Sequence, residues 1–513
     1  MWQQFFGRTT WWTAVGLALG TTLGALVFRV EVLQPIILIF LAGLSGYLYV
    51  KRPSLAFVLV FAELFGFSHG RLFGSELFGV LVTGRMAIFI GVLLAWVAMV
   101  LFANKSARIP YTFLYGLILL FVALSIGVFI GVGNNTLSHV FDDLNGYLYL
   151  LYALPILTVP WTRDDHRTIL QALFGSALWM GILSLVLLYL FSHLGGEASS
   201  ALYTLLRDAR IGEFTFMDAG YWRIFLQSQI VLVVTLVMSR TAMIEDSTRW
   251  FDGRSFLWLT LLFSGFIVSF SRSFWLGLVC GAIAVVVMTI RSKKLRPALR
   301  NVPTIALAFV ASLVLLAAVS ILPWPLASNA GFGGVRSRAT DLSDVAVSSR
   351  WNLLPVMSEA ILEAPILGHG FGKQLTFVTD DPRARAIAPD GTWTTYKFEW
   401  GWLDLWVKMG FLGVASFLWM FWALAHGVAK RQGLPWWLRT SMIAVLVAVF
   451  FIHGFSPYLN HPLGLGVLLF AVFFLGDEPQ PRLVMALAKR VQMSRPYPSE
   501  AVSARISKTT HPL

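Results

Sequence analysis

The chain has 513 residues, of which 57% are hydrophobic and only 13% are charged. A single soluble core cannot bury this much apolar surface, so the composition excludes a soluble globular domain and indicates a polytopic membrane protein. The net charge of +13 does not indicate nucleic-acid binding. Most of the excess lies in short loops and in the tail after Gly476, where anionic membrane lipids account for it.

Apolar runs predict an all-α fold with about 12–14 transmembrane helices, because a span across the roughly 30 Å hydrocarbon layer needs about 20 apolar residues. Several runs are shorter than this. In chain order they cover 13–28, 33–50, 54–67, 78–103, 111–132, 147–161, 168–193, 221–243, 255–270, 274–290, 303–322, 401–425, 437–455 and 462–475.

The runs and loops predict three regions. Residues 1–220 are N-terminal transmembrane helices, 221–475 are a membrane core with a large loop at 323–398, and 476–513 are a cytoplasmic tail. The tail is predicted to begin as an amphipathic surface helix and to continue as a disordered segment. Within the large loop, 348–363 is predicted to be helical with an interruption at Pro355, and a charged, Pro- and Gly-rich stretch after it to be mobile.

Basic residues fall on alternate connections, which predicts that these connections and both termini are cytoplasmic. The segment 194–220, the tight turn 271–273 and the loop 323–398 are then outside. We expect the chemistry of the protein at this outer face.

Two charges stand out among the apolar runs. Arg272 lies between two of them, and a guanidinium beside hydrocarbon is costly unless a phosphate, a carboxylate or water is near. Arg272 is therefore a candidate functional residue. Glu63, alone in the third run, is expected to pair with Arg71 or Arg85.

No metal or cofactor is expected. The nine histidines show no His-Glu-x-x-His pattern, the acid pairs Asp142-Asp143 and Asp380-Asp381 are isolated, and the single cysteine lies in an apolar run. The glycine-rich segment 368–372 is interpreted as a glycine-built turn. A phosphate-binding loop would need a preceding strand and a following Lys-Ser/Thr, and both are missing.

The chain re-enters the membrane near Glu399. At about 100° per residue, Glu399, Trp402 and Trp406 share one helix face, which places a carboxylate beside aromatic rings of the kind on which sugars stack. The alternative interpretation is that the tryptophans are interfacial anchors. Asp404 and Lys408 are spaced for an i,i+4 ion pair, and a proton relay from Glu399 is the alternative.

Several short motifs follow one another between residues 221 and 413. They are 270–277 (FSRSFWLG), Ser349-Arg350-Trp351 and 364–372 (APILGHGFG) in the large loop, and 410–413 (GFLG). In their order and topology these motifs resemble the O-antigen ligase and O-antigen polymerase superfamily.

The resemblance implies a membrane glycosyltransferase in the bacterial inner membrane whose active face is periplasmic. Such enzymes transfer a glycan from an undecaprenyl-diphosphate carrier, without a metal, to the lipid A core or to another lipid-linked repeat. The expected partners are therefore this donor, a glycan or lipid A-core acceptor, and membrane lipids.

Three arginines match positions of the resembled family: Arg223, Arg272 and Arg350. The leaving group is a lipid diphosphate, whose negative charge grows as the glycosidic bond breaks, so fixed cations are needed at the membrane edge. Arg223 and Arg272 are predicted to bind the diphosphate, and Arg350 to be a third contact or a loop anchor. The alternative for Arg223 is a pair with Asp218, Glu213 or a backbone carbonyl.

The chain departs from the family's pattern at one position. Ligases of this family usually carry a His-Asn pair where the large loop returns to the membrane, and Glu399-Trp400 stands there instead. Glu399 is predicted to be the general base, because a carboxylate can deprotonate an acceptor hydroxyl. The departure favours a polymerase over a ligase.

His369, His453 and His461 lie on or near the outer face and are alternative bases, although a capping or interfacial role is the favoured interpretation of each. The rival function is a secondary transporter or a flippase of lipid-linked glycans. The chain shows no internal repeat and no matching pair of glycine- or proline-broken helices, which are typical of such transporters.

Overall fold

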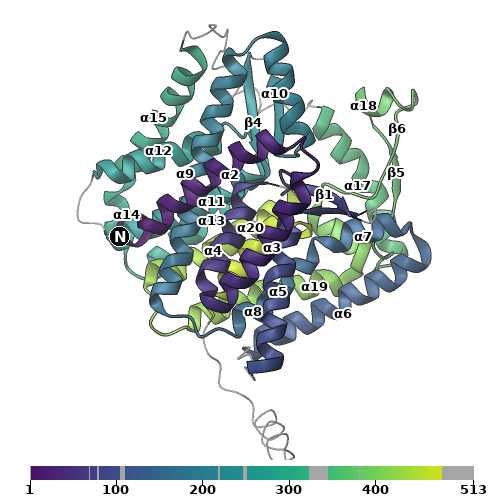
Figure 1. Cartoon of the computed structure of the whole chain (residues 1–513), viewed down its shortest axis with the longest axis horizontal. Coiled ribbons are helices and arrows are strands. Elements are labelled where there is room, and N and C mark those ends of the chain that lie inside the picture. The colour runs from purple at the N-terminus through teal and green to yellow at the C-terminus, as the bar shows by residue number, and fades with distance from the viewer. Residues whose placement is uncertain are drawn as a thin grey trace, which may run out of the picture.

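A computed structural model describes residues 2–68, 70–77, 80–103, 110–217, 220–246, 251–322, 345–379 and 382–475. The described residues are almost entirely helical and include three two-stranded antiparallel sheets. The tail from residue 476 and the start of the large loop, with the predictions made for them, lie outside these ranges. Figure 1 shows the helices packed into one bundle, with the β5–β6 hairpin and α18 projecting from one side.

Ten helical segments of the described chain are long and apolar enough to cross a membrane, judged by length and composition. Three apolar helices are shorter. The long segments are formed by α2 (Arg8–Val27), α3 (Leu33–Lys51), α5 (Gly84–Ala103), α6 (Tyr111–Asn134), α9 (Arg163–His193), α11 (Ile230–Glu245), α13 (Arg272–Arg291), α15 (Val302–Ile321), α19 (Gly401–Lys430) and α20 (Trp436–Phe455), and the shorter helices are α4 (Pro53–Gly66), α12 (Gly253–Ile267) and α21 (Pro462–Val472).

The remaining elements lie in the connections between these helices. They are α1 (Trp2–Phe5), β1 (Gly74–Leu77), β2 (Val80–Thr83), α7 (Leu137–Asn145), η1 (Tyr147–Tyr152), α8 (Ala153–Leu157), α10 (Gly196–Asp208), β3 (Gly212–Met217), β4 (Tyr221–Leu226), η2 (Gln227–Gln229), α14 (Leu295–Arg300), α17 (Val345–Glu363), β5 (Leu375–Val378), α18 (Pro382–Arg385), β6 (Thr392–Thr395) and η3 (Tyr458–Asn460).

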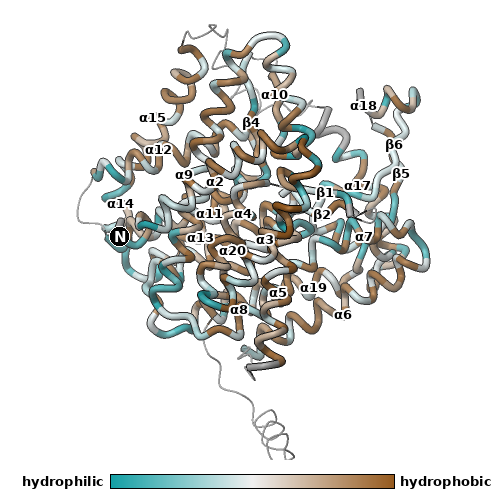
Figure 2. Tube along the Cα trace, viewed as in Figure 1, coloured by the Kyte–Doolittle hydropathy of each residue, from teal (hydrophilic) through white to brown (hydrophobic). Residues whose placement is uncertain are grey.

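The all-α polytopic membrane fold is confirmed. α11 is almost completely buried and most of α9 is buried, so these two apolar helices form the centre of the bundle. The helices around them expose large apolar side chains, among them Leu26, Phe129 and Val314. Figure 2 shows hydrophobic residues on central and peripheral helices alike, as expected when the solvent around the bundle is lipid.

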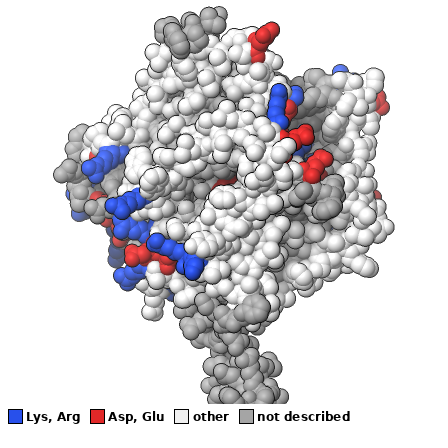
Figure 3. All heavy atoms as spheres, in the orientation of Figure 1, with Lys and Arg blue, Asp and Glu red and all other residues white. Residues whose placement is uncertain are grey.

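Charged residues mark two ends of the bundle. We define the loop face as the end that carries the described residues of the connections 67–83, 135–152, 194–229, 268–271, 345–400 and 456–461. In Figure 3 lysines and arginines gather at the lower left, near α14, with fewer acidic residues among them, and charges of both signs also gather at the upper right, near β1 and α17. The broad uncharged surface between them is of the kind that a bilayer covers.

Four predicted elements differ from the structure. The described part of the run 78–103 begins as β2, which pairs with β1, and α5 follows it. The run 147–161 forms η1 and the short α8 instead of a span, with Pro155 in the first turn of α8, where its missing N–H costs no helical hydrogen bond. The run 221–243 begins as β4, which pairs with β3 in an antiparallel hairpin. The helix predicted to break at Pro355 continues through it as α17, because Leu353 and Met357 are buried against β5 and α19.

A glycine-rich segment locks the large loop to the bundle. Gly368, Gly370 and Gly372 all have positive φ angles of 72–80°, and a Cβ at the first two would overlap the backbone of Gly410 and Gly131. Between them, Phe371 is fully buried, and its amide donates to the Gly127 carbonyl of α6 at 3.0 Å. The interpretation of this segment as a glycine-built turn is confirmed.

α19 is interrupted at Gly410, whose φ of 64° and ψ of −167° are not helical. The backbone groups released by the break bond to the segment before it: His369 N donates to Val407 O at 2.7 Å, and Phe411 N donates to Pro365 O at 2.9 Å. The two halves of α19 are therefore joined through the large loop.

Replacing Gly410 with Ala is expected to destabilise the protein strongly. The left-handed backbone alone costs about 1–3 kcal/mol for a residue with a side chain, and a Cβ there would also overlap the Ile366 carbonyl. The matched control is Gly433→Ala, at a φ of 84° with open space around it. Melting temperatures in detergent separate the cost of the backbone conformation, which both variants share, from the overlap with the Ile366 carbonyl, which only Gly410→Ala has. Equal melting temperatures for both variants would contradict the role assigned to Gly410.

Candidate active site

The corner between α12 and α13 carries two arginines: Arg272 begins α13, and Arg223 bonds to the corner from β4. We call this set (Arg223, Arg272 and residues 268–271) the cationic corner. Arg223 reaches it from β4, which is tied to the corner by a hydrogen bond from Ile224 N to Val268 O of 3.0 Å. Its Nε donates to the Ser269 carbonyl at 3.0 Å, and its guanidinium lies over the Phe225 ring, 5.0 Å from the centroid. The side chain is therefore held in one direction.

Arg223 also contacts Glu213, one of the partners that the alternative interpretation predicted for it. Its Nη1 lies 3.5 Å from Glu213 Oε2, across the β3–β4 hairpin. Glu213 is 61% exposed, so this ion pair contributes little stability and competes weakly for the guanidinium. Arg223 was expected to open a helix, but it lies on a strand because β3 and β4 pair through the turn at Gly220.

Arg272 is the first residue of α13, and Ser271 is the residue before the helix. The positive end of a helix dipole is an unfavourable place for a cation and a favourable one for an anion. The first amides of α13 therefore make this corner more favourable for an anion. The corner is held in place by hydrogen bonds, since Ser273 Oγ contacts Ser271 Oγ at 3.1 Å and Ser456 Oγ at 2.9 Å.

Glu399 lies at a second position on the loop face, where Arg350 Nε donates to its Oε2. Both side chains are well exposed, Arg350 at 39% and Glu399 at 54%. The aromatic side chains beside them are Trp400, whose Nε1 donates to the Arg350 carbonyl at 2.9 Å, and Trp351, whose ring packs edge-on against Trp400. The structure thus pairs Arg350 with Glu399.

The prediction that Glu399 shares a helix face with Trp402 and Trp406 is wrong. α19 begins at Gly401, so Glu399 belongs to the extended segment that precedes the helix. The two tryptophans use their indole N–H groups elsewhere: Trp402 donates to Phe450 O at 3.1 Å, and Trp406 donates to Pro365 O at 2.9 Å. They anchor α19 to α20 and to the large loop.

The cationic corner and Glu399 border the same connection, 455–458. On one side Ser456 bonds to Ser273 of the corner at 2.9 Å. On the other side the ring of Phe455 packs against Trp400, with centroids 5.3 Å apart. The structure therefore brings a cationic site and a carboxylate to one face of the bundle, with the end of α20 between them.

The three histidines have structural roles. His369 contacts the Ala360 carbonyl at 2.7 Å, and His461 caps α21 by accepting from Leu463 N at 3.3 Å. His453 is fully buried and accepts from Leu459 N at 3.2 Å. These contacts support the capping interpretation of each histidine.

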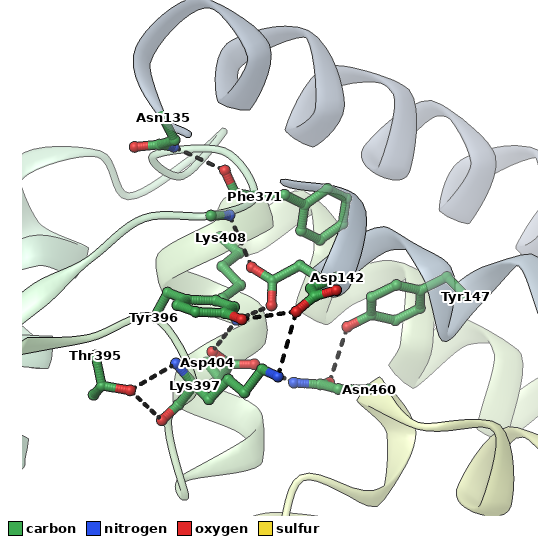
Figure 4. Close-up of polar contacts among 12 residues, drawn as sticks. Asn135, Asp142, Tyr147, Phe371, Thr395, Tyr396, Lys397, Asp404, Lys408 and Asn460 are labelled. Carbon is green, nitrogen blue, oxygen red and sulfur yellow. Dashed lines mark hydrogen bonds and ion pairs between the residues drawn. The ribbon is translucent and has the colours of Figure 1, made fainter. Parts of the chain in front are cut away.

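A buried ion network lies beneath this face, as Figure 4 shows. Lys408 Nζ lies 2.9 Å from Asp404 Oδ1, which confirms the predicted pair, and 2.8 Å from Asp143 Oδ1 of α7. Asn460 donates to Asp404 and accepts from the Tyr147 hydroxyl at 2.9 Å. The second oxygen of Asp143 accepts from Gly372 N at 2.8 Å.

A second, more exposed set of contacts adjoins this network. The Tyr396 hydroxyl donates to Asp142 Oδ2 at 2.8 Å, Lys397 Nζ lies 3.7 Å from the same oxygen, and the Tyr396 ring stacks on His139 at 4.0 Å. Burial, then the hydrogen bond and the charge of Asp142, raise the pKa of Tyr396 to about 12, so its hydroxyl stays protonated and donates.

Asp142 and Asp143 were predicted to be isolated acids, and this prediction is wrong. Their partners lie up to 265 residues away along the chain, so no local pattern could reveal them. The one available signal was an adjacent acid pair close to the end of a transmembrane run. Glu63 does have a predicted partner: its carboxylate pairs with Arg85 Nε at 2.9 Å, and both side chains are buried.

Comparison with known proteins adds one match. Residues 255–418 match the family described as O-antigen ligase, over a segment that includes Arg272, Arg350 and Glu399. Residues 255–418 are an O-antigen ligase domain. No curated protein and no solved structure matches the chain.

The O-antigen ligase domain lies within a multi-pass membrane protein, so the protein is a membrane glycan ligase or polymerase. Arg223 and the acid pair of α7 lie outside the matched segment. In the part of the chain that the structure describes, no three His, Cys, Asp or Glu side chains gather as a metal site requires.

Proposed function

We propose that the protein transfers or polymerises a glycan from an undecaprenyl-diphosphate carrier at the loop face, by an inverting mechanism that uses no metal. The observation that carries the proposal is the joint placement of the cationic corner and Glu399 on this face. A lipid diphosphate needs fixed cations as its negative charge grows, and an acceptor hydroxyl needs a base.

The proposed reaction is one displacement at the anomeric carbon. The acceptor hydroxyl oxygen attacks this carbon and passes its proton to Glu399. The bond from the anomeric carbon to the diphosphate oxygen breaks, and the carrier diphosphate leaves with the electron pair. Arg223 and Arg272, aided by the first amides of α13, bind the diphosphate, while Arg350 anchors the loop through its ion pair with Glu399.

We also propose the orientation. The loop face is periplasmic, the membrane is the bacterial inner membrane, and both termini are cytoplasmic. The gathering of Lys and Arg at the opposite end of the bundle supports this, since short cytoplasmic connections carry the excess of basic residues.

A polymerase is favoured over a ligase by Glu399-Trp400, which stands where ligases of the resembled family carry His-Asn. We expect cells that lack the protein to make surface glycans of a single repeat, because the acceptor is still loaded but not extended. A gel ladder of the surface polysaccharide measures this. Long chains that remain on the carrier lipid would instead indicate a ligase.

Glycan transfer is expected to proceed in EDTA. Purified protein is mixed with lipid-linked repeat units, and product is followed with and without chelator. A parallel assay measures the movement of the lipid-linked glycan across vesicles that contain the Arg272→Ala variant. We expect this movement to be unchanged in the variant while glycan transfer falls. Transfer that needs an added divalent ion would contradict the mechanism, and lost flux would indicate a transporter.

A further inference from the structure

The acid pair of α7 contacts the chain on both sides of Glu399. Asp142 contacts Tyr396 and Lys397, which lie two to three residues before Glu399. Asp143 contacts Lys408, which also pairs with Asp404 five residues after Glu399. Two adjacent residues from one short helix therefore bracket the segment that carries the carboxylate.

The two contacts differ in strength. Lys408, Asp143 and Asp404 have side chains no more than 8% exposed, and the ammonium of Lys408 is the cation between both carboxylates. Breaking such a buried set leaves a charge without a partner, so the structure resists it. Lys397 and Asp142 are more than half exposed, and that ion pair is weak, but the Tyr396 hydroxyl bond and the stack on His139 support it.

Asp143 also joins the glycine-rich segment to this set. Its Oδ2 accepts from Gly372 N at 2.8 Å, and Asn135, just before α7, donates to the Phe371 carbonyl at 2.8 Å. The glycine-rich segment and the end of the large loop, at Tyr396 and Lys397, are therefore both attached to the α6–α7 region. This region precedes the O-antigen ligase domain by more than 100 residues, so the domain alone lacks these contacts.

We propose that Asp142 and Asp143 are positioning residues that fix the direction of Glu399 toward the acceptor hydroxyl. They touch no reacting atom and act through the segment 396–408. This inference rests on the proposed function of Glu399. A misplacement of about 1 Å at a catalytic group can lower a rate about a hundredfold, so the contacts need only shift slightly to have an effect.

A double-mutant cycle tests the proposal. Asp143→Asn keeps the shape and the acceptor for Gly372 N but removes the charge that faces Lys408. We expect kcat to fall about tenfold with the donor KM nearly unchanged, and to fall less than about twofold when the same change is made in Glu399→Gln. Single-turnover rates with excess enzyme make the slow variants measurable.

A second variant, Tyr396→Phe, separates a positioning effect from misfolding. It keeps the stack on His139 and loses only the hydroxyl bond to Asp142. We expect a smaller fall in kcat, again absent in the Glu399→Gln background, even where Asp143→Asn fails to fold. Equal fold-losses in both backgrounds would overturn the positioning proposal alone. A Glu399→Gln enzyme at the wild-type rate would overturn both this proposal and the proposed base.

Discussion

Glycan transfer by Glu399→Gln is expected to be about 10²–10⁴-fold slower than by the wild type, the usual contribution of a general base. The amide is nearly the same size as the carboxylate but cannot accept the proton of the acceptor hydroxyl. Donor binding should change little, because the proposed site of the diphosphate is the cationic corner and not Glu399. Initial rates with purified lipid-linked repeats, with donor and acceptor varied separately, measure kcat and both KM values.

The matched control is Glu359→Gln, an exposed glutamate on α17 in the same loop. We expect it to retain the wild-type rate. The ion pair of Glu399 with Arg350 is well exposed, so its loss should change the melting temperature only slightly. A Glu399→Gln enzyme within about twofold of the wild-type rate would exclude Glu399 as the base.

Replacing Arg272 with Ala is expected to lower the rate about 10²–10³-fold, the usual effect of removing one group that stabilises a developing negative charge. Arg272→Lys should recover only part of this, because an ammonium keeps the charge but loses the planar fork that matches phosphate oxygens. Release of the carrier diphosphate from lipid-linked donor, followed in EDTA, measures the step that breaks the bond.

Arg207→Ala is the matched control, since Arg207 lies on α10 at the loop face, is 61% exposed and pairs with the neighbouring Asp208. We expect no change in its rate. Arg223→Ala should resemble Arg272→Ala in rate, with an added loss of stability because Arg223 also binds the Ser269 carbonyl. Full activity of Arg272→Ala would show that the corner does not bind the leaving group.

Much of the fold could be predicted from local sequence. Apolar runs mark each of the ten long apolar helices of the described chain, because lipid and the buried core both require apolar side chains over about 20 residues. The corner at Arg272 was visible as a charge between two such runs, and Arg85 was one of two partners foreseen for Glu63. In each case the information lies within a short stretch of chain.

The rest depends on contacts between distant segments. The β3–β4 hairpin interrupts an apolar run because two strands pair across a turn, which the hydropathy of β4 does not show. Glu399 lies outside α19 because the helix begins at Gly401, and a difference of two residues changes which face it occupies. Asp143 and Lys408 meet only because the glycine-rich segment allows the loop to pass close to α6 and α7.

The interruption of α19 at Gly410 also bears on how the protein is made. A broken helix leaves amide and carbonyl groups that lipid cannot satisfy, and here the segment 365–370 satisfies them. That segment is synthesised before α19, so the groups that complete the helix are already present when α19 emerges from the ribosome. The broken backbone of α19 is therefore completed by a segment that precedes it in the chain, and we expect α19 to take its final form together with the large loop.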